Sequence, residues 1–600
     1  MRLLITFIST SLLSIIIACS SSSEKESAIG APQDPSILAP PSDKRAWLTK
    51  ANLESNTYPH SSPIHNGYFM PVGIESPALE EFSGTITISN GQIIGNFSEN
   101  YLIGDESFKN FPNVDFSFFS NNGKLIPINR DRQVTLEDDS FWGIILDPGK
   151  VWSEADDNGW SRASFPFTFI SARRNNAHNG LATFLYKGTE ISHLRIQIVQ
   201  ETALWFKNDM MAQLSANYET QIFAQRDSIL EAYLSEVENT VMIKDWSELE
   251  KISSNERLTE FNSNLSTNTI NQTALIKDNE VYLQPCYTRY GNYPYCRWMR
   301  NGAYSMTKSM GMALTTFRLA EKYGTDLFDL KIGDYLNVTA SHSGWDLVTF
   351  GNVLSMAVGI GDLSSTQGSG EIFADENQTK METWIAKNSE IEKLSLSFSY
   401  GNYTWGPGVE FRYNSALHFV LAAALDNYYK NIAGENADLW QMIIDEVFLP
   451  IGIQHVPNIR TIETDDSFGI AELFHGLYLN VDDMAKISML LQNEGSNNGV
   501  QLLHKEKLKE ALFRTEEQGL HSWWEDNQYG ESRYLHGFWT SPFGNNINCL
   551  EQIPYMSGYG GNMFAILPNG ISLFRFSDSE SYTPSNMIKI SNIERSICPN

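Results

Sequence analysis

The chain has 600 residues, of which 42% are hydrophobic and 19% charged, and its formal net charge is -28. This composition is typical of a folded globular protein, and the length exceeds one ordinary core, so two domains are expected after any targeting segment. The strong negative charge argues against nucleic acid or anionic lipid headgroups as partners.

The first residues have the pattern of an export signal. Arg2 precedes an apolar run from Leu3 to Ile17, and Ala18-Cys19-Ser20 follows. A basic start, an apolar stretch and a small residue before the cleavage point are typical of a signal peptide. Because a cysteine follows directly, residues 1–18 resemble a bacterial lipoprotein signal, with Cys19 as the lipidated residue. An ordinary signal peptide and a single membrane anchor are the alternatives.

Two segments of different composition follow. Residues 19–45 are rich in Ser, Pro, Ala and charge, which predicts a flexible tether. Residues 46–200 contain short apolar runs separated by turn residues, which predicts a mostly antiparallel β domain, a sandwich or barrel. Asn90-Gly91 and Asn122-Gly123 each lie between two such runs and predict two β-hairpins.

The second half of the chain mixes helical and strand patterns. We expect a helical connector over 201–273 and a second domain over 274–600, which makes the fold class α+β. Apolar residues at helical spacing predict one helix from Met306 that Gly324 ends, and further helices over 415–429 and 482–492. The runs at 562–567 and 571–576 predict a hairpin around Pro568-Asn569-Gly570.

Four cysteines remain after Cys19. They are Cys286, Cys296, Cys549 and Cys598. An even number in an exported chain predicts two disulfides, and of the three pairings we favour Cys286–Cys296 with Cys549–Cys598. No Cys-x-x-Cys or clustered His/Cys pattern is present, so no metal or other cofactor is expected.

Ser305 and Lys308 form the pattern that carries most information. Residues three apart share one face of a helix, so the amine of Lys308 can reach the hydroxyl of Ser305. A lysine with a depressed pKa can remove the proton of a serine and make it a nucleophile. A helix-capping serine and a solvent-facing lysine are the alternative, because such pairs also arise by chance, as at Ser22 and Lys25.

Two later stretches strengthen the catalytic interpretation. Tyr413-Asn414-Ser415 precedes an apolar helix, where a tyrosine can project its hydroxyl into a site. Ser557-Gly558-Tyr559 lies near the end of the chain, where glycine lets a backbone N–H approach a substrate and stabilise an oxyanion.

The order of Ser-x-x-Lys, tyrosine and a Gly-rich strand resembles the serine β-lactamase and penicillin-recognising hydrolase family. The resemblance is closest to its class C-like branch, which includes DD-peptidases, family VIII esterases and 6-aminohexanoate-dimer hydrolases. Supporting stretches such as Leu354-Ser355-Met356 and Gly476-Leu477-Tyr478 occur in the expected order. The resemblance covers roughly residues 286–576 and leaves 46–272 unexplained. It implies an antiparallel sheet flanked by helices, with a helical lobe.

The resemblance also implies roles for individual residues. Ser305 would be the acylated nucleophile, Lys308 its base and Tyr413 a partner in proton transfer, so Lys308 and Tyr413 would titrate as a coupled pair. The backbone N–H groups of Ser305 and Tyr559 would form the oxyanion hole. Gly558, Ser557 and Ser415 would line the substrate site.

Two departures from the family pattern bear on the substrate. Ser415 stands where β-lactamases have asparagine, and the esterase and aminohexanoate branches tolerate serine there. Met556 stands where the usual Lys-Thr-Gly motif has lysine, a cation that meets a substrate carboxylate. We therefore predict a neutral ester or amide substrate, unless an arginine elsewhere replaces the missing charge.

The sequence thus predicts an exported serine hydrolase, lipid-anchored in the bacterial cell envelope, on the periplasmic face of an outer membrane or at the cell surface. Its predicted partners are a small-molecule ester or amide and, through Cys19, the membrane. A β-lactamase or DD-peptidase with the same mechanism is one alternative. The other is a non-catalytic cell-envelope binding protein whose N-terminal domain contacts cell wall or glycan through aromatics such as Trp142, Trp152 and Trp160.

Overall fold

A computed structural model describes most of the chain beyond the N-terminal segment. The described residues are 45–55, 61–72, 75–95, 106–134, 140–202, 208–252, 260–263, 265–362, 375, 378–546 and 549–598. The predicted signal peptide, Cys19 and nearly all of the predicted tether lie outside them. Within this part of the chain, no helix is both long and apolar enough to cross a membrane.

The N-terminal half forms a 12-stranded antiparallel sheet within the described residues. The pairing order is β12-β1-β3-β4-β6-β7-β8-β10-β11-β2, and β5 and β9 pair with β7 and β8. Its strands are β1 (Ser83–Ile88), β2 (Ile94–Gly95), β3 (Asp115–Asn121), β4 (Lys124–Pro127), β5 (Trp142–Leu146), β6 (Gly149–Ser153), β7 (Ser161–Ser171), β8 (Ala177–Lys187), β9 (Glu190–Ile191), β10 (Leu194–Thr202), β11 (Met210–Leu214) and β12 (Ala216–Thr220).

Aromatic residues fill the core of this first sheet. Phe118, Phe165 and Phe184 are fully buried in one cluster to which strands from β1 to β11 contribute. Ring pairs such as Phe118–Phe165, with centroids 4.8 Å apart, add edge and offset contacts to the hydrophobic burial. Trp142 and Trp152 are also buried, at 1% and 0% exposure, so they stabilise the sheet and offer no glycan-binding platform. Trp160 is only partly buried, and Lys50 lies over its ring.

One of the two predicted N-terminal hairpins is present. Strands β3 and β4 pair around Asn122 and Gly123, whose φ angles of 47° and 77° suit a tight hairpin turn. The hairpin predicted around Asn90-Gly91 is wrong, because β1 pairs with β3 and β12 whereas β2 pairs with β11. Gly91 lies against Phe111, and its carbonyl accepts a hydrogen bond from the N–H of Phe111.

The second half forms a 9-stranded sheet within the described residues, in the order β13-β15-β14-β29-β28-β27-β26-β25-β24. Its pairs are antiparallel except β13 with β15. The strands are β13 (Met242–Asp245), β14 (Ile270–Lys277), β15 (Glu280–Leu283), β24 (Leu520–His521), β25 (Arg533–Leu535), β26 (Phe538–Asn546), β27 (Cys549–Gly558), β28 (Asn562–Ile566) and β29 (Ser572–Ser577). The predicted C-terminal hairpin is β28 with β29.

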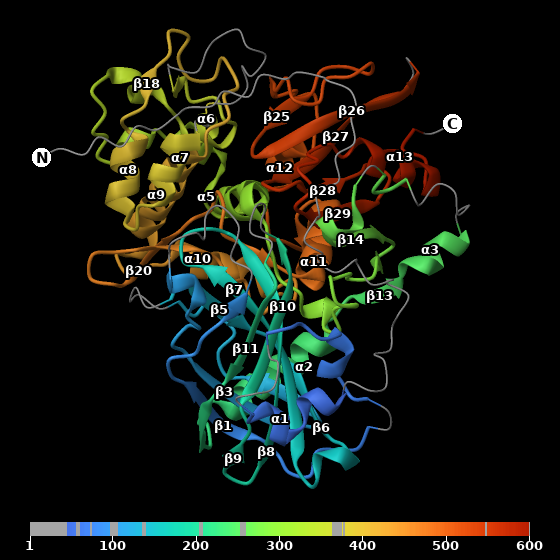
Figure 1. Cartoon of the computed structure of the whole chain (residues 1–600). Helices are drawn as coiled ribbons and strands as arrows, with labels where there is room; N and C mark the ends of the chain where they lie inside the picture. Colours follow the sequence, from blue (N-terminus) through green and yellow to red (C-terminus); the bar gives the residue numbers. More distant parts are fainter. Residues whose placement is uncertain are drawn as a thin grey trace, which may run out of the picture.

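Helices accompany this second sheet and form a separate lobe beside it. Figure 1 shows α6–α9 gathered away from the red strands β25–β28, with α5 between the two groups. The helices are α1 (Lys50–Leu53), α2 (Arg226–Glu238), α3 (Trp246–Ile252), α5 (Leu314–Tyr323), α6 (Phe350–Leu354), α7 (Gln378–Ile385), α8 (Glu390–Ser397), α9 (Ser415–Ala433), α10 (Leu439–Ile443), α11 (Val481–Gln492), α12 (Lys505–Ala511) and α13 (Ser585–Glu594). The fold is α+β, with an antiparallel sheet, flanking helices and a helical lobe, as the sequence predicted.

The expected helical connector over 201–273 is wrong in part. Helices α2 and α3 lie there, but β11 and β12 complete the first sheet and β13 and the start of β14 belong to the second. The strands β11, β12 and β13 have four or five residues each. A hydrophobic pattern this short does not distinguish a strand from a helix. Their conformation is fixed by pairing with other strands of the two sheets.

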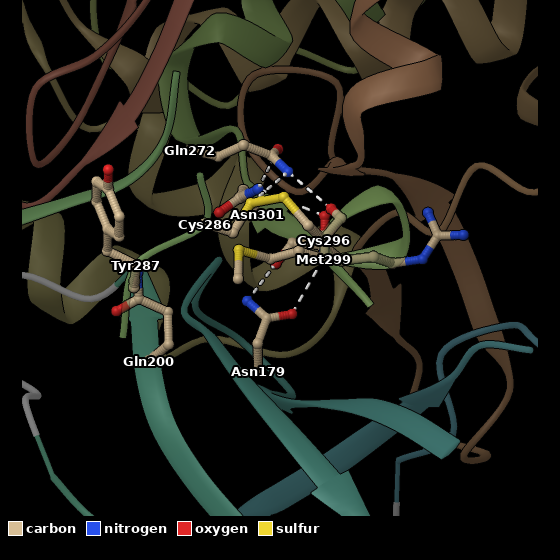
Figure 2. Close-up of a disulfide and its surroundings, with 9 residues drawn as sticks. Asn179, Gln200, Gln272, Cys286, Tyr287, Cys296, Met299 and Asn301 are labelled. Carbon is tan, nitrogen blue, oxygen red and sulfur yellow. Dashed lines mark hydrogen bonds between the residues drawn. A yellow bond between two sulfur atoms is a disulfide. The ribbon is translucent and has the colours of Figure 1, made fainter. Parts of the chain in front are cut away.

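Two disulfides are present, with the pairing favoured from the sequence. Cys286–Cys296 closes a loop of the second half, and Cys549–Cys598 ties β27 to the C-terminus. Figure 2 shows Gln272 beside the first disulfide, where its amide donates to the carbonyl of Cys296 and accepts from Asn301. The bridge therefore supports the segment that leads into residues 301–305.

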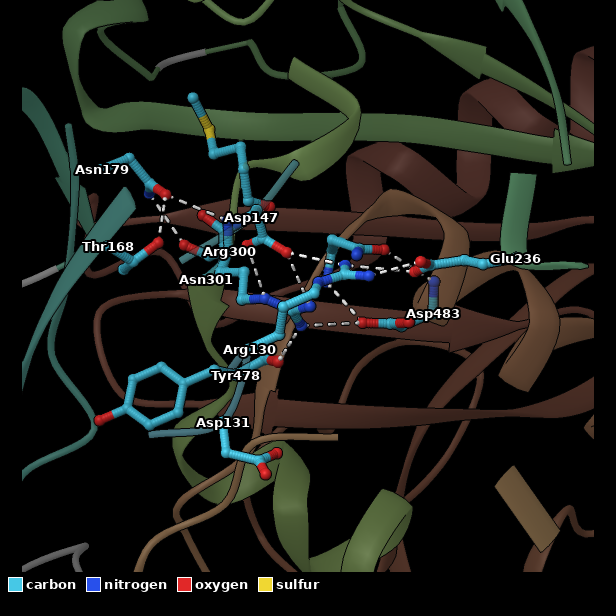
Figure 3. Close-up of polar contacts among 12 residues, drawn as sticks. Arg130, Asp131, Asp147, Thr168, Asn179, Glu236, Arg300, Asn301, Tyr478 and Asp483 are labelled. Carbon is cyan, nitrogen blue, oxygen red and sulfur yellow. Dashed lines mark hydrogen bonds and ion pairs between the residues drawn. The ribbon is translucent and has the colours of Figure 1, made fainter. Parts of the chain in front are cut away.

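A buried charged network joins the two halves. Asp147, between β5 and β6, accepts hydrogen bonds from Arg130 and from Arg300, and all three side chains are at most 3% exposed. Arg130 also pairs with Glu236 of α2, and Arg300 lies 3.5 Å from Asp483 of α11. Figure 3 shows these side chains converging from the first sheet, α2 and the second half. Since buried charges need partners, the network holds the halves in one arrangement.

Candidate active site

Ser305 lies in a sharp turn between a short strand and a helix. β16 (Asn301–Gly302) pairs with β21 (Tyr478–Leu479), and a 3₁₀ turn over Tyr304–Met306 follows. Tyr304 has a φ of 47°, a left-handed conformation that is uncommon for a residue other than glycine. Backbone strain of this kind clusters at functional sites.

Local helix geometry brings Lys308 over Ser305. In a 3₁₀ helix the side chains at i and i+3 are eclipsed, and Ser305 lies in such a turn. Lys308 begins a π-helical segment over Lys308–Ala313, which continues into α5 and ends at Gly324, φ 100°. The predicted helix is therefore present, with 3₁₀ and π-helical turns at its start.

Lys308 is the centre of the site. Its side chain is buried, and its Nζ lies 2.9 Å from Ser305 Oγ, 2.9 Å from Ser415 Oγ and 3.3 Å from the carbonyl oxygen of Phe474. Three directed contacts fix the amine against the hydroxyl of Ser305. Ser305 itself is half-buried, so the hydroxyl lies at the edge of the buried region.

The start of α9 brings two more predicted residues to Lys308. Asn414 is the N-cap, and its side chain accepts a hydrogen bond from the N–H of Leu417. This cap places Ser415 in the first turn of α9 and Tyr413 just before the helix. The Tyr413 ring centroid lies 4.9 Å from Lys308 Nζ. The structure therefore brings Ser305, Lys308, Tyr413 and Ser415 together.

Strand β27 brings the Gly-rich stretch to the same place. A Cβ on Gly558 would lie 2.4 Å from the carbonyl oxygen of Ala303, so only glycine allows the strand to pass this close to the turn. Asn562 donates to the carbonyl oxygens of Gly302 and Tyr559, at 3.0 and 3.2 Å, and links the end of β27 to the Ser305 segment.

The side chains around this link differ in their surroundings. Tyr559 is 47% exposed, and its ring centroid is 5.7 Å from that of Tyr304. Ser557 is half-buried and lies opposite Met563 in the β27–β28 pair. Met556 is fully buried in the apolar core that also holds Met306 and Met310. A thioether in the core supplies no charge at this point of β27.

The histidines of the second half lie in different surroundings. His418 of α9 is fully buried, and burial first, then the nearby Lys308, lowers its pKa to about 3. Burial also holds the pKa of His475 well below its usual value. His536 contacts Ser355 and Glu510 but is 7% exposed, and burial lowers its pKa too. All three are neutral near pH 7, and their contacts are structural.

Several contributing groups were not predicted from the sequence. The carbonyl of Phe474, the amide of Asn562 and the side chains of Asn175 and Asn176 from the first sheet all contact the Ser305–Lys308 segment or its neighbours. A backbone carbonyl and lone asparagines leave no pattern in a single sequence. In the described part of the chain, no group of three or more metal-ligating side chains occurs.

No family model and no curated protein matches the chain. Similar solved structures include a putative 6-aminohexanoate-dimer hydrolase from Bacillus anthracis, with 18% identity, TM-score 0.39 and coverage of 55% of this chain and 79% of that chain. A penicillin-binding protein homolog from Caulobacter crescentus has 13% identity, TM-score 0.38 and coverage of 57% and 96%. A putative β-lactamase from Bacteroides dorei has 12% identity, TM-score 0.39 and coverage of 59% and 98%. At TM-scores below 0.5, we base the function on the geometry of the site.

Proposed function

We propose that the protein is a serine hydrolase of the β-lactamase-like type, which cleaves a carboxylic ester or small amide through an acyl-enzyme on Ser305. The contact that carries the proposal is Lys308 Nζ at 2.9 Å from Ser305 Oγ, with the amine buried and fixed by Ser415 and Phe474. A nucleophile within hydrogen-bond reach of a base that is itself oriented by further groups is the arrangement that activated serines require.

Each step can be assigned to a residue of the site. The neutral amine of Lys308 takes the proton of Ser305 as Oγ attacks the carbonyl carbon, and the N–H groups of Ser305 and Tyr559 stabilise the oxyanion. Tyr413 passes a proton to the leaving alcohol or amine as the bond to the acyl carbon breaks, and Lys308 passes on to Tyr413 the proton that it took from Ser305. Water then attacks the acyl ester and gives a proton to the Lys308–Tyr413 pair, which passes it to Ser305 Oγ as the carboxylic acid leaves.

The surroundings favour a neutral substrate over a carboxylate-bearing one. Met556 is fully buried and uncharged at the family's lysine position, so an ester or small amide is preferred to a penicillin or a peptide C-terminus. Export and lipid anchoring at Cys19 are part of the proposal, on the strength of the pattern in residues 1–20.

Covalent labelling tests the proposal. The chain from Ser20 onward is treated with a fluorophosphonate probe, and its intact mass is measured beside Ser305→Ala and Ser22→Ala variants. Ser22 is the matched control, because it has the same spacing to a lysine. One adduct on wild type and Ser22→Ala, with none on Ser305→Ala, is expected.

A folded wild-type protein without an adduct contradicts the proposal and favours the non-catalytic binding alternative. Hydrolysis of nitrophenyl esters compared with nitrocefin then separates an esterase from a β-lactamase. Faster turnover of nitrocefin than of every ester would contradict the neutral-substrate assignment.

A further inference from the structure

The loop between β7 and β8 (residues 172–176) belongs to the first sheet but reaches the turn that carries Ser305. Its contacts with the second half are polar, unlike the aromatic core of its own sheet, and two of the residues that make them, Asn175 and Asn176, are buried. We call it the β7–β8 loop.

Asn175 holds the backbone immediately before the nucleophile. Its side chain is fully buried, its Oδ1 accepts a hydrogen bond from the N–H of Tyr304 at 2.6 Å, and its Nδ2 donates to the carbonyl of Leu477 at 3.2 Å. The amide therefore bridges the Ser305 turn and the neighbouring strand β21. Because Tyr304 has a φ of 47°, this hydrogen bond offsets the cost of a left-handed non-glycine residue.

Asn176 holds the side chain of the same residue. The hydroxyl of Tyr304 donates to Asn176 Oδ1 at 2.8 Å, and Asn176 is only 4% exposed. Burial raises the pKa of Tyr304 well above its usual value, so the hydroxyl remains a donor at every pH of interest. On its other side the Tyr304 ring contacts the Tyr559 ring, whose backbone belongs to the oxyanion site. Tyr304 thus links the loop to both oxyanion groups.

The backbone of the β7–β8 loop also lies close to the segment that precedes Ser305. A Cβ on Gly302 would lie 1.7 Å from the carbonyl oxygen of Asn175, so glycine is required for the two backbones to approach. Asn179 of β8 adds a pair of hydrogen bonds to the backbone of Arg300, at 3.0 and 2.8 Å. The segment 300–304 is therefore bonded to the N-terminal half at both of its ends, at Arg300 and at Tyr304.

We propose that Asn175 and Asn176 of the β7–β8 loop are positioning residues that set the reactivity of Ser305 through Tyr304. The inference rests on the proposed hydrolase function. It assigns the N-terminal sheet a role in the reaction in place of an independent binding role.

Labelling kinetics test this with a double-mutant cycle. The maximal rate of fluorophosphonate labelling and the half-saturating probe concentration are measured for Asn176→Ala, Tyr304→Phe and the double variant. Each single change removes one buried hydrogen bond and is expected to lower the maximal rate about tenfold, with the half-saturating concentration unchanged. Because both changes remove the same interaction, the double variant is expected to lose no more than either single variant.

Arg173→Ala is the matched control in the same loop, since its guanidinium bonds Asn388 and not the Ser305 segment. Its labelling rate is expected to equal that of wild type. Losses that multiply in the double variant, or an equal loss in Arg173→Ala, would overturn the inference. A loss confined to the half-saturating concentration would also overturn it, because positioning of the nucleophile acts on the rate.

Amide hydrogen exchange gives a readout that needs no activity. Exchange in a peptide covering residues 302–306 is expected to accelerate about tenfold in Asn175→Ala and Asn176→Ala and to stay unchanged in Arg173→Ala. Unchanged exchange in both variants would overturn the positioning role. A wild-type protein that does not label refutes the hydrolase proposal alone, whereas exchange still decides whether the loop holds the segment.

Discussion

The two sheets use polar residues in different ways. The first sheet encloses an aromatic core, and its buried polar residues Asp147, Asn175 and Asn179 face the second half. The second half supplies Ser305, Lys308 and Tyr413 from its own turn and helix starts. One region provides the proposed reacting groups, and the other provides contacts to the segment that carries Ser305.

On the proposed mechanism, the first sheet supports the site without contributing a reacting atom. Apolar contact between the halves would tolerate small shifts, since hydrophobic attraction has no direction. Charged and amide hydrogen bonds at fixed distances tolerate much less. Each variant described next changes one region, and its labelling rate or free energy of unfolding shows whether the other region is affected.

The largest effect is expected inside the catalytic half. Replacing Lys308 with Met removes the proposed base, and labelling of Ser305 is expected to fall roughly 10²- to 10⁴-fold, the usual scale for a general base. Stopped labelling reactions resolved by intact mass measure the rate. Lys486→Met is the matched control, since Lys486 is also a buried lysine bonded to a carbonyl, that of Gly452, on another helix. Equal losses in both variants would show that the labelling rate responds to the loss of any buried lysine and not to the loss of a catalytic base.

The second-largest effect is expected in the buried charged network that joins the two halves. Asp147→Ala leaves the buried guanidinium groups of Arg130 and Arg300 without their shared carboxylate. The free energy of unfolding is expected to fall by about 3–5 kcal/mol, measured by urea denaturation. A loss below about 1 kcal/mol would mean that the halves are held together by other contacts, and the comparison between the two regions would lose its basis.

The free energy of unfolding is expected to fall in acid partly because of His418 in the second half. His418 has a pKa of about 3 in the folded protein, because of burial and then Lys308, against about 6.5 when unfolded. The unfolded chain therefore binds the proton first, and the stability present above pH 6.5 is lost as pH falls toward 3. His418→Leu is expected to reduce the slope of unfolding free energy against pH by about 1.4 kcal/mol per pH unit in that window.

Urea denaturation of both proteins at a series of pH values measures this slope. Parallel curves for wild type and variant between pH 6 and 4 would contradict the assignment.

The smallest effect is expected where the halves meet at the surface. Arg174 of the β7–β8 loop pairs with Glu382 of α7, and the side chains are 30% and 38% exposed. Solvent screens such a pair, so Glu382→Gln is expected to change the unfolding free energy by about 0–1 kcal/mol and the labelling rate by less than about twofold. Thermal unfolding and labelling measure both quantities. A loss as large as that of Asp147→Ala would show that exposed and buried contacts between the halves are equivalent.

Local patterns were sufficient for part of the fold. The hairpin at Asn122-Gly123 was predictable because two turn residues adopt the conformation that a tight hairpin needs. The same dipeptide at Asn90-Gly91 gave a wrong prediction, because β1 and β2 on its two sides pair with other strands. Strands β12 and β14 were missed for the related reason that each has a partner, β1 and β29 respectively, that lies far away in sequence.

The candidate site likewise contains residues that could be predicted from the sequence and residues that could not. Ser305 and Lys308 were predictable as a pair because helical spacing determines which side chains share a face. The order of Tyr413 and Tyr559 along the chain suggested their roles only through resemblance. Asn175, Asn176 and Asn562 were not predictable, because a hydrogen bond between residues more than a hundred positions apart has no local signal.

By itself, the sequence determined the α+β class and the three-residue spacing that lets Lys308 reach Ser305. Among three possible cysteine pairings, it favoured the one that the structure contains. These depend on the periods of helices and strands and on short-range spacing. Only the tertiary structure decided that Lys308 is buried against Ser415 and Phe474, that Trp142 and Trp152 belong to a core, and that asparagines of the first sheet hold the turn before Ser305. The physical reason is that burial and directed hydrogen bonds depend on which distant segments meet.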